Sequence, residues 1–177
     1  ETLDGGPAVL VGAPWYHEGH LYNAALLLDE GKIMAQRFKR DLPNYGVFDE
    51  VRVFKKGPVA GPVSVRGVRI GIMLCEDMWF EEVAEALSES GAQILVVMNG
   101  SPYEIDKDNS RLNFAVARVQ ETGLPLIYVN QVGGQDELVF DGGSFVLDAS
   151  NNLCLQAPRW EQSLAISEWT ALGNGKW

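Results

Sequence analysis

The sequence predicts an α/β domain with mixed sheets. Short apolar runs alternate with two segments of helical periodicity along 177 residues, of which 46% are hydrophobic and 21% charged. The run at 94–98 is apolar at every position, which is typical of a strand covered on both faces. The segment 22–33 instead places two apolar runs around Asp29, Glu30 and Gly31, as an antiparallel hairpin does. Covered strands and a hairpin in one chain indicate both parallel and antiparallel pairing.

The individual elements follow from where each apolar run meets turn-forming residues. In chain order, strands are expected at 8–11, 22–28, 32–38, 68–74, 94–98, 126–129, 143–147 and 153–156. Helices are expected at 80–90 and 109–122, which carry apolar residues at helical spacing. Gly91 and Gly123 follow these two segments directly, and glycine is favoured just beyond a helix end.

Charge and composition exclude several classes of partner. A formal net charge of −10 argues against nucleic acid, because binding to a polyanion needs a basic stripe. No apolar run approaches the ~20 residues of a membrane span. Residues 1–6 also lack the basic and apolar regions of a signal peptide. We therefore expect a cytoplasmic protein that binds neither nucleic acid nor a membrane.

The cysteine and histidine content predicts neither a disulfide framework nor a metal site. Cys75 and Cys154 lie far apart in the sequence, in neither a C-x-x-C nor a zinc spacing. His17 and His20 form a weak candidate metal pair, but Pro14 and the glycine between the histidines favour a solvated loop there. No metal is therefore expected.

Cys75 gives the strongest indication of chemistry. It follows the apolar run 68–74 and precedes the sequence Glu-Asp-Met-Trp, after which helical periodicity begins. A thiol at a sharp strand-to-helix turn projects from the edge of a sheet, near backbone N–H groups that can hold an oxyanion. The competing interpretation is a small buried cysteine, and the strand context alone favours it.

Other segments contain residues that could assist a reactive thiol. Lys39 follows the predicted strand 32–38, and a lysine near a thiolate stabilises negative charge on sulfur and on a tetrahedral intermediate. Glu50 is a carboxylate suited to orienting that lysine, although Lys39 taken alone is typical of the surface. The segment 99–103 falls at the same sheet edge as Cys75 if their strands are parallel. The glycine-rich segment 133–144 lacks phosphate-loop spacing and is interpreted as turns between strands.

Four motifs occur together in a fixed order. They are Lys39-x-x-Leu42-Pro43-Asn44-Tyr45-x-Val47-Phe48-Asp49-Glu50-x-Arg52, Cys75-Glu76-Asp77-x-Trp79, Asn99-Gly100-Ser101-Pro102-Tyr103 and Asn130-Gln131-Val132-Gly133-Gly134-Gln135-Asp136. In this combination the chain resembles the nitrilase-type glutaminase domain of bacterial glutamine-dependent NAD synthetases, within the carbon–nitrogen hydrolase superfamily. The likeness covers nearly the whole chain. It implies an α-β-β-α sandwich with mixed sheets, incomplete at the N-terminus, and it makes a merely buried Cys75 the minor interpretation.

The resemblance implies roles for individual residues. Cys75 would be the nucleophile that forms a γ-glutamyl thioester, Lys39 would support the oxyanion, and Glu50 would support Lys39. A pocket for glutamine would be lined by Tyr45, Phe48, Glu76 and Ser101, where Glu76 faces the α-ammonium group and Ser101 offers a hydroxyl. Core packing remains an equal alternative for Tyr45 and Phe48. Lys107 and Arg111 would either contact the glutamine carboxylate or solvate a helix start.

The likeness also implies parts that this chain does not contain. The family's general-base glutamate lies upstream of residue 1, so we expect a partial glutaminase domain at 1–170 with its general acid–base contribution of roughly 10²–10⁴-fold lost. Residues 171–177 would begin a linker to an absent synthetase domain of the same polypeptide. That domain would use ATP and magnesium to amidate deamido-NAD, whereas the glutaminase domain needs no cofactor. A homo-oligomer is implied as well.

Two other functions stay open on the sequence. One is a free-standing amidase of the same superfamily that acts on another small amide. The other is an inactive scaffold whose surface around 131–140 docks other subunits.

Overall fold

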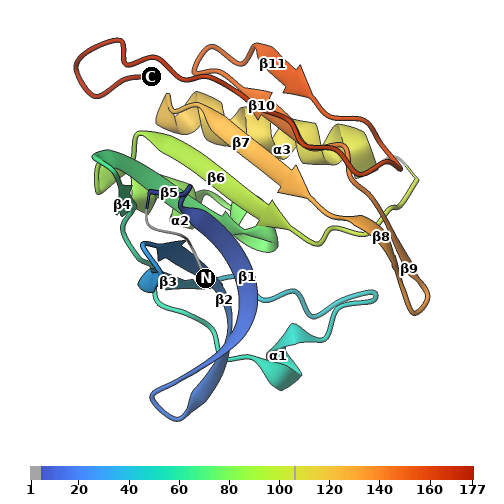
Figure 1. Cartoon of the computed structure of the whole chain (residues 1–177). Helices are drawn as coiled ribbons and strands as arrows, with labels where there is room; N and C mark the ends of the chain where they lie inside the picture. The colour runs from blue at the N-terminus through green and yellow to red at the C-terminus, as the bar shows by residue number, and fades with distance from the viewer. Residues whose placement is uncertain (1–4, 106) are drawn as a thin grey trace.

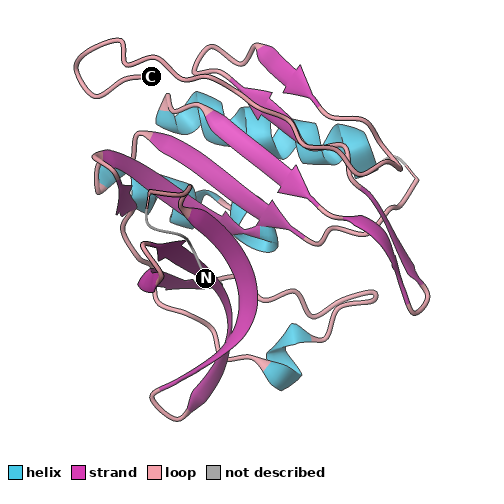
Figure 2. Ribbon diagram, viewed as in Figure 1, coloured by secondary structure: helices cyan, strands magenta, loops and turns pink. Residues whose placement is uncertain are grey.

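Three layers make up the structure, a computed structural model that describes residues 5–105 and 107–177, with only the backbone at 107–109. The described residues place a six-stranded sheet in the middle. Helices α2 (Glu81–Glu89) and α3 (Lys107–Thr122) cover one face of it (Figures 1 and 2). A three-stranded sheet lies against the opposite face (Figure 1). The α/β class with mixed sheets is confirmed, and these layers are the α, β and β layers of the expected sandwich.

The six-stranded sheet has the order β11-β10-β7-β6-β5-β4. Its strands are β4 (Val63–Val65), β5 (Val68–Leu74), β6 (Ile94–Asn99), β7 (Leu126–Asn130), β10 (Phe145–Leu147) and β11 (Leu153–Gln156). Strands β5, β6 and β7 are parallel, whereas β4, β10 and β11 pair antiparallel. The loops that follow β5 and β6 therefore emerge at the same edge, as the sequence predicted.

Successive side chains of β5 point to opposite faces of the sheet, so this strand packs against both outer layers. Met73 packs with the core under the helices, whereas Ile72 and Leu74 pack with the three-stranded sheet. Gly71 lets α2 approach closely, because a Cβ there would lie 3.2 Å from the Leu87 side chain of that helix and 2.9 Å from the Leu95 side chain of β6. A strand buried on both faces is why the sequence 70–74 is continuously apolar.

The three-stranded sheet is antiparallel and consists of β1 (Val9–His17), β2 (His20–Asp29) and β3 (Lys32–Phe38). The predicted β2–β3 hairpin is confirmed. Strand β1 runs well beyond the predicted 8–11, because Pro14 lies in an edge strand, where its missing N–H breaks no ladder. The solvated loop expected around the two histidines is wrong, since His17 ends β1 and His20 begins β2 directly opposite.

Three short features were not predicted. Helix α1 (Glu50–Val53) is a single turn, and β4 has three residues, so neither offers enough periods to be recognised. The segment 133–144, interpreted as turns, instead contains the hairpin of β8 (Val132–Gln135) and β9 (Leu138–Asp141). Two adjacent glycines in β8 carry no side chains, so the sequence shows no alternation of apolar and polar residues there by which a strand could be recognised.

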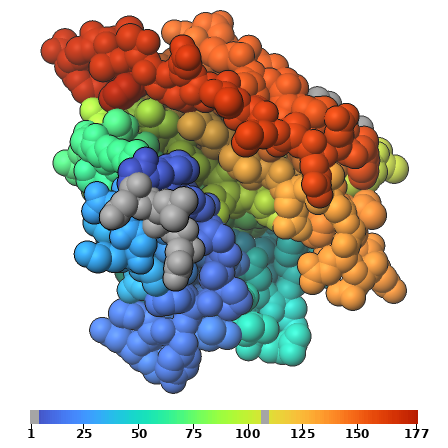
Figure 3. All heavy atoms as spheres, in the orientation of Figure 1, coloured from blue at the N-terminus to red at the C-terminus, as the bar shows by residue number. Residues whose placement is uncertain are grey.

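The C-terminal segment 157–177 runs back over β10 and β11, and forms the red ridge in Figure 3. Its far end is bonded to the connection just before β6, since Gln93 Nε2 donates to the Gly175 carbonyl oxygen (3.2 Å). None of the helices in the described part of the chain is long and apolar enough to cross a membrane.

Candidate active site

A cavity of about 340 Å³ opens at the carboxyl edge of the parallel strands. It is lined by Gly12, Asn23, Lys39, Phe48, Glu50, Leu74, Cys75, Met98, Asn99, Gly100 and Gln131. These residues come from both sheets, from α1 and from the segments that end β5, β6 and β7. The structure thus brings together the three predicted catalytic residues and the predicted pocket residue Phe48.

Cys75 stands at the junction between β5 and a 3-10 turn, Cys75–Met78. Its φ of 49° lies in the left-handed region, which is rare for a residue with a side chain and costs about 1–3 kcal/mol. Such a conformation persists only where its surroundings fix it, and here the Leu74 N–H donates to Asp77 Oδ2 (3.0 Å) across the turn. The half-buried thiol is thereby presented at the end of the strand, on the wall of the cavity.

Lys39 is almost fully buried, with 2% of its side chain exposed. Its Nζ donates to Glu50 Oε1 at 2.6 Å, and Asn23 Nδ2 donates to Glu50 Oε2 at 3.2 Å. The backbone of Lys39 is held as well, since its N–H donates to the Asn23 carbonyl oxygen and its carbonyl accepts from the Gly57 N–H, both at 2.8 Å. A buried ammonium group with a fixed carboxylate partner is a preorganised positive charge beside the thiol.

Asn23 was missed in the sequence. The signal was an amide inside the otherwise apolar run of β2, where a half-buried polar side chain needs a partner. Asn99 and Gln131 also line the cavity, and both were quoted within motifs without a role.

Tyr45 and Glu76 form a pair next to this cavity. Tyr45 Oη donates to both carboxylate oxygens of Glu76, at 2.8 and 2.9 Å. Burial raises the pKa of Glu76, and burial together with the bond to Glu76 raises the pKa of Tyr45. The pair lines a neighbouring cavity of about 440 Å³, and the Tyr45 ring meets the Phe48 ring edge-on at 5.8 Å. Tyr45 is half exposed, so core packing is the wrong interpretation for it.

Ser101 is buried and does not appear among the described residues that line the Cys75 cavity. Its N–H donates to Asn130 Oδ1 (2.9 Å), and its hydroxyl accepts from Arg111 Nε (3.2 Å). A contact between Ser101 and a substrate stays a prediction. Arg111 is itself buried, so solvation of a helix start is the wrong interpretation for it; the Lys107 side chain lies outside the described residues.

Arg111 organises the loop after β6. Its Nη1 donates to both oxygens of Asp141 (2.9 and 3.0 Å), and its Nη2 donates to the carbonyl oxygens of Ser101 and Pro102 (2.8 and 2.9 Å). Asp141 has no exposed surface and also accepts from Arg159. The charges of this cluster are compensated by one another and by backbone oxygens, as burial requires.

Replacing Arg111 by methionine should therefore lower the free energy of unfolding by about 3–5 kcal/mol, since it leaves a buried carboxylate with one cation fewer. Urea unfolding followed by circular dichroism measures this change. The matched control is Arg52→Met, which breaks an exposed pair with Asp49 and should cost at most about 1 kcal/mol. Equal losses in the two variants would contradict a stabilising Arg111–Asp141 pair.

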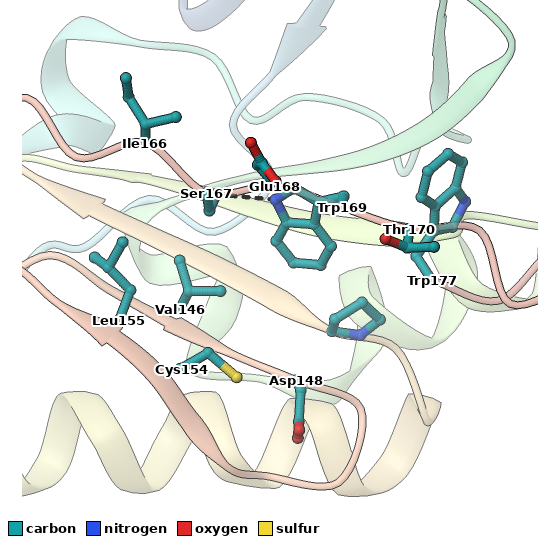
Figure 4. Close-up of a pocket in the computed structure, with 11 residues that line it drawn as sticks. Val146, Asp148, Cys154, Leu155, Ile166, Ser167, Glu168, Trp169, Thr170 and Trp177 are labelled. Atoms are coloured by element: carbon teal, nitrogen blue, oxygen red, sulfur yellow. Dashed lines mark hydrogen bonds between the residues drawn. The ribbon is translucent and has the colours of Figure 1, made fainter.

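Cys154 lies in a different setting, a cavity of about 330 Å³ between the strands β10 and β11 and the C-terminal segment (Figure 4). Apolar side chains dominate its walls, and Trp169 Nε1 donates to Ser167 Oγ (2.9 Å). Of the described residues that line it, Asp148 and Glu168 are charged and none is basic. Of the two cysteines, Cys75 is the one whose cavity is also lined by the buried Lys39–Glu50 pair.

The chain is an α/β protein of two stacked sheets. At one strand edge it presents a cysteine together with a buried lysine–glutamate pair. More narrowly, it belongs to the carbon–nitrogen hydrolase family, whose sequence model matches residues 4–171. The family expected from the four motifs is confirmed.

Individual relatives narrow the similarity further. The glutamine-dependent NAD(+) synthetase of Rhodobacter capsulatus is 45% identical over 159 residues, which are 90% of this chain and 29% of that protein. The solved Acinetobacter baumannii glutamine-dependent NAD+ synthetase, bound to ADP, matches at a TM-score of 0.83 and 37% identity, over 88% of this chain and 30% of its own. This chain thus spans about 30% of the length of these relatives.

A shorter relative comes from Nesterenkonia sp. AN1. A mutant of the amidase from this organism, solved after Michael addition of acrylamide at its active-site cysteine, matches at a TM-score of 0.73 and 28% identity. The match covers 88% of this chain and 60% of the amidase.

Proposed function

We propose that this chain is a glutamine amidohydrolase domain that converts glutamine to glutamate and ammonia through a thioester on Cys75. The observation that carries the proposal is the cavity shared by Cys75 and the buried Lys39–Glu50 pair. The similarity to glutamine-dependent NAD synthetases supports glutamine as the substrate, and the amidase modified by acrylamide at its active-site cysteine supports a reactive thiol.

In the first half-reaction, the Cys75 sulfur attacks the side-chain carbonyl carbon of glutamine and forms a carbon–sulfur bond. The carbonyl electrons move onto oxygen, and the Lys39 ammonium group stabilises this oxyanion. When the oxyanion collapses, the carbon–nitrogen bond breaks and the nitrogen leaves as ammonia with the proton that the thiol gave up. Water then attacks the thioester, the carbon–sulfur bond breaks, and glutamate and the thiol are released.

Glu50 acts in this scheme by orienting Lys39 rather than by carrying protons. Both of its oxygens already accept hydrogen bonds, one from Lys39 and one from Asn23. Glu50 is also the only carboxylate among the described residues that line the cavity. We therefore expect slow turnover, because a dedicated general base contributes roughly 10²–10⁴-fold.

Glutamine recognition falls to the neighbouring pair. The Glu76 carboxylate, held by Tyr45, offers a negative charge for the α-ammonium group of glutamine, and Phe48 supplies an apolar wall. Ser101 is proposed as a further polar contact from the loop after β6.

The released ammonia would serve a synthetase domain of the same polypeptide, which would use ATP and magnesium to amidate deamido-NAD. This part of the proposal is supported by the names of the relatives, by the ADP bound in the Acinetobacter baumannii structure, and by the share of those longer chains that this chain matches. A homo-oligomer in which this domain contacts its neighbours belongs to the same proposal.

A second candidate function is an amidase for other small amides. The Nesterenkonia amidase, solved in complex with butyramide as a mutant protein, favours it. Glutamine differs from butyramide by its α-amino and carboxylate groups, so the two candidates differ in whether charged recognition groups matter.

Ammonia release separates the candidates. The chain should release ammonia from glutamine at least about tenfold faster than from asparagine, whose shorter side chain loses one methylene of reach. Ammonia release from butyramide should be slower still, because butyramide has no ammonium group for Glu76 to bind. Faster release from butyramide would favour the amidase, and no release from any amide would favour an inactive scaffold.

A further inference from the structure

Asp77 is the most deeply buried acid of the nucleophile turn, with 2% of its surface exposed. Its carboxylate accepts three backbone hydrogen bonds. Oδ2 accepts from the Leu74 N–H (3.0 Å), and Oδ1 accepts from the N–H groups of Arg40 (2.9 Å) and Asp41 (2.8 Å). Three short bonds from N–H groups to one charged acceptor make a rigid joint.

The donors of these bonds belong to two separate sheets. Leu74 ends β5 of the middle sheet and immediately precedes Cys75, whereas Arg40 and Asp41 follow Lys39 at the end of β3. One carboxylate therefore ties the chain beside the thiol to the chain beside the ammonium group. We propose that Asp77 is a positioning residue that fixes Lys39 relative to Cys75, an inference that builds on the glutaminase mechanism above.

The need for such a joint follows from the chemistry. An oxyanion donor must be held in place before reaction, and a misplacement of about 1 Å can cost 10²-fold in rate. Lys39 and Cys75 are anchored in different layers, so small sliding of one sheet on the other would change their separation. Asp77 holds both strand ends with a single side chain.

The electrostatics of Asp77 agree with a role other than stability. Burial raises its pKa to about 6, although its backbone bonds and the charge of Lys39 act in the opposite direction and Asp41 adds repulsion. At pH 7 the carboxylate is charged in both folded and unfolded chains, so this raised pKa costs folding free energy. Asparagine removes that cost, and Asp77→Asn should therefore fold.

Asparagine cannot keep the joint. Its side chain has nearly the same shape, but one oxygen becomes an NH₂ group, which would face either the Leu74 N–H or the pair from Arg40 and Asp41. At least one of the three bonds is lost in either orientation. The partly exposed Asp148 is a matched control, because it also accepts backbone bonds, from Ser150 and Asn152, and lies in the β10–β11 turn.

The test is the pH profile of Cys75 alkylation by iodoacetamide, measured by mass spectrometry in a Cys154→Ser background. Removing the charge of Asp77 alone would lower the midpoint pH of this profile, because a nearby anion opposes the thiolate. Releasing Lys39 from Cys75 would raise it. We expect Asp77→Asn to raise the midpoint by about one pH unit, and Asp148→Asn to leave it unchanged.

A double-mutant comparison completes the test. In a Lys39→Met background, Asp77→Asn should no longer raise the midpoint, because there is no ammonium group to misplace. An unchanged or lowered midpoint in Asp77→Asn, or the same rise without Lys39, would overturn the proposal. Alkylation needs no glutamine, so this result is independent of whether the chain is a glutaminase. Where glutamine is turned over, kcat should fall about tenfold or more with KM little changed.

A second measurement uses the unaltered chain. In NMR spectra, the amide protons of Leu74, Arg40 and Asp41 should shift together with one midpoint near pH 6, as Asp77 gains a proton and these bonds weaken. Separate midpoints, or none, would show that no common carboxylate joins the two strand ends.

Discussion

Cys75→Ala is expected to lower ammonia release from glutamine by at least about 10³-fold, the largest effect of any single change in this chain. Alanine removes the sulfur that forms the carbon–sulfur bond in the proposed mechanism, and it keeps the small volume of the site. The measurement is ammonia release under saturating glutamine, with folding checked by circular dichroism. Covalent trapping by a substrate-like alkylating agent, followed by mass spectrometry, should report the same loss.

Cys154→Ala is the control for this experiment. The second cysteine lies in β11, the edge strand of the middle sheet, and lines the cavity under the C-terminal segment, so it should be dispensable (Figure 4). If alanine at Cys75 left the rate unchanged, while alanine at Cys154 lowered it, the assignment of the nucleophile would be wrong.

Lys39→Met should lower kcat by about 10²–10³-fold with a much smaller change in KM. In the proposed mechanism the Lys39 ammonium group binds the oxyanion of the transition state more strongly than the ground-state carbonyl. Removing this group therefore lowers mainly kcat. Methionine fills much of the space of the lysine stem, which limits repacking. Steady-state kinetics of ammonia release measure both constants.

Two further variants distinguish the effect of the Lys39 charge on the reaction from the effect of the Lys39–Glu50 pair on the stability of the fold. Lys32→Met removes an exposed lysine at the start of β3 and should leave the kinetics unchanged. Lys39→Met combined with Glu50→Gln avoids an unpaired carboxylate, and should restore stability without restoring kcat. Recovery of kcat in the double variant would assign the defect to the stranded Glu50 rather than to the missing oxyanion support.

Local patterns in the sequence were enough to predict the main strands, both long helices and the exit of Cys75 at a strand end. Apolar periodicity indicates which faces of an element are buried. The run 70–74 indicates burial on both faces from its own sequence, whichever elements pack against it. The motifs likewise carried the family. Where the pattern was short or made of glycine, as in α1 and the β8–β9 hairpin, the prediction was absent or wrong.

The sequence by itself therefore determined the class, the family and the candidate nucleophile. Tertiary structure alone decided that Asn23 holds Glu50, that Arg111 is buried against Asp141, and that the Asp77 carboxylate joins two sheets. The reason is physical: a buried polar group must find a partner, but which partner it finds depends on which strand ends meet in space. Which strand ends come together depends on how the two sheets stack, and the periodicity of a single segment contains no information about that stacking.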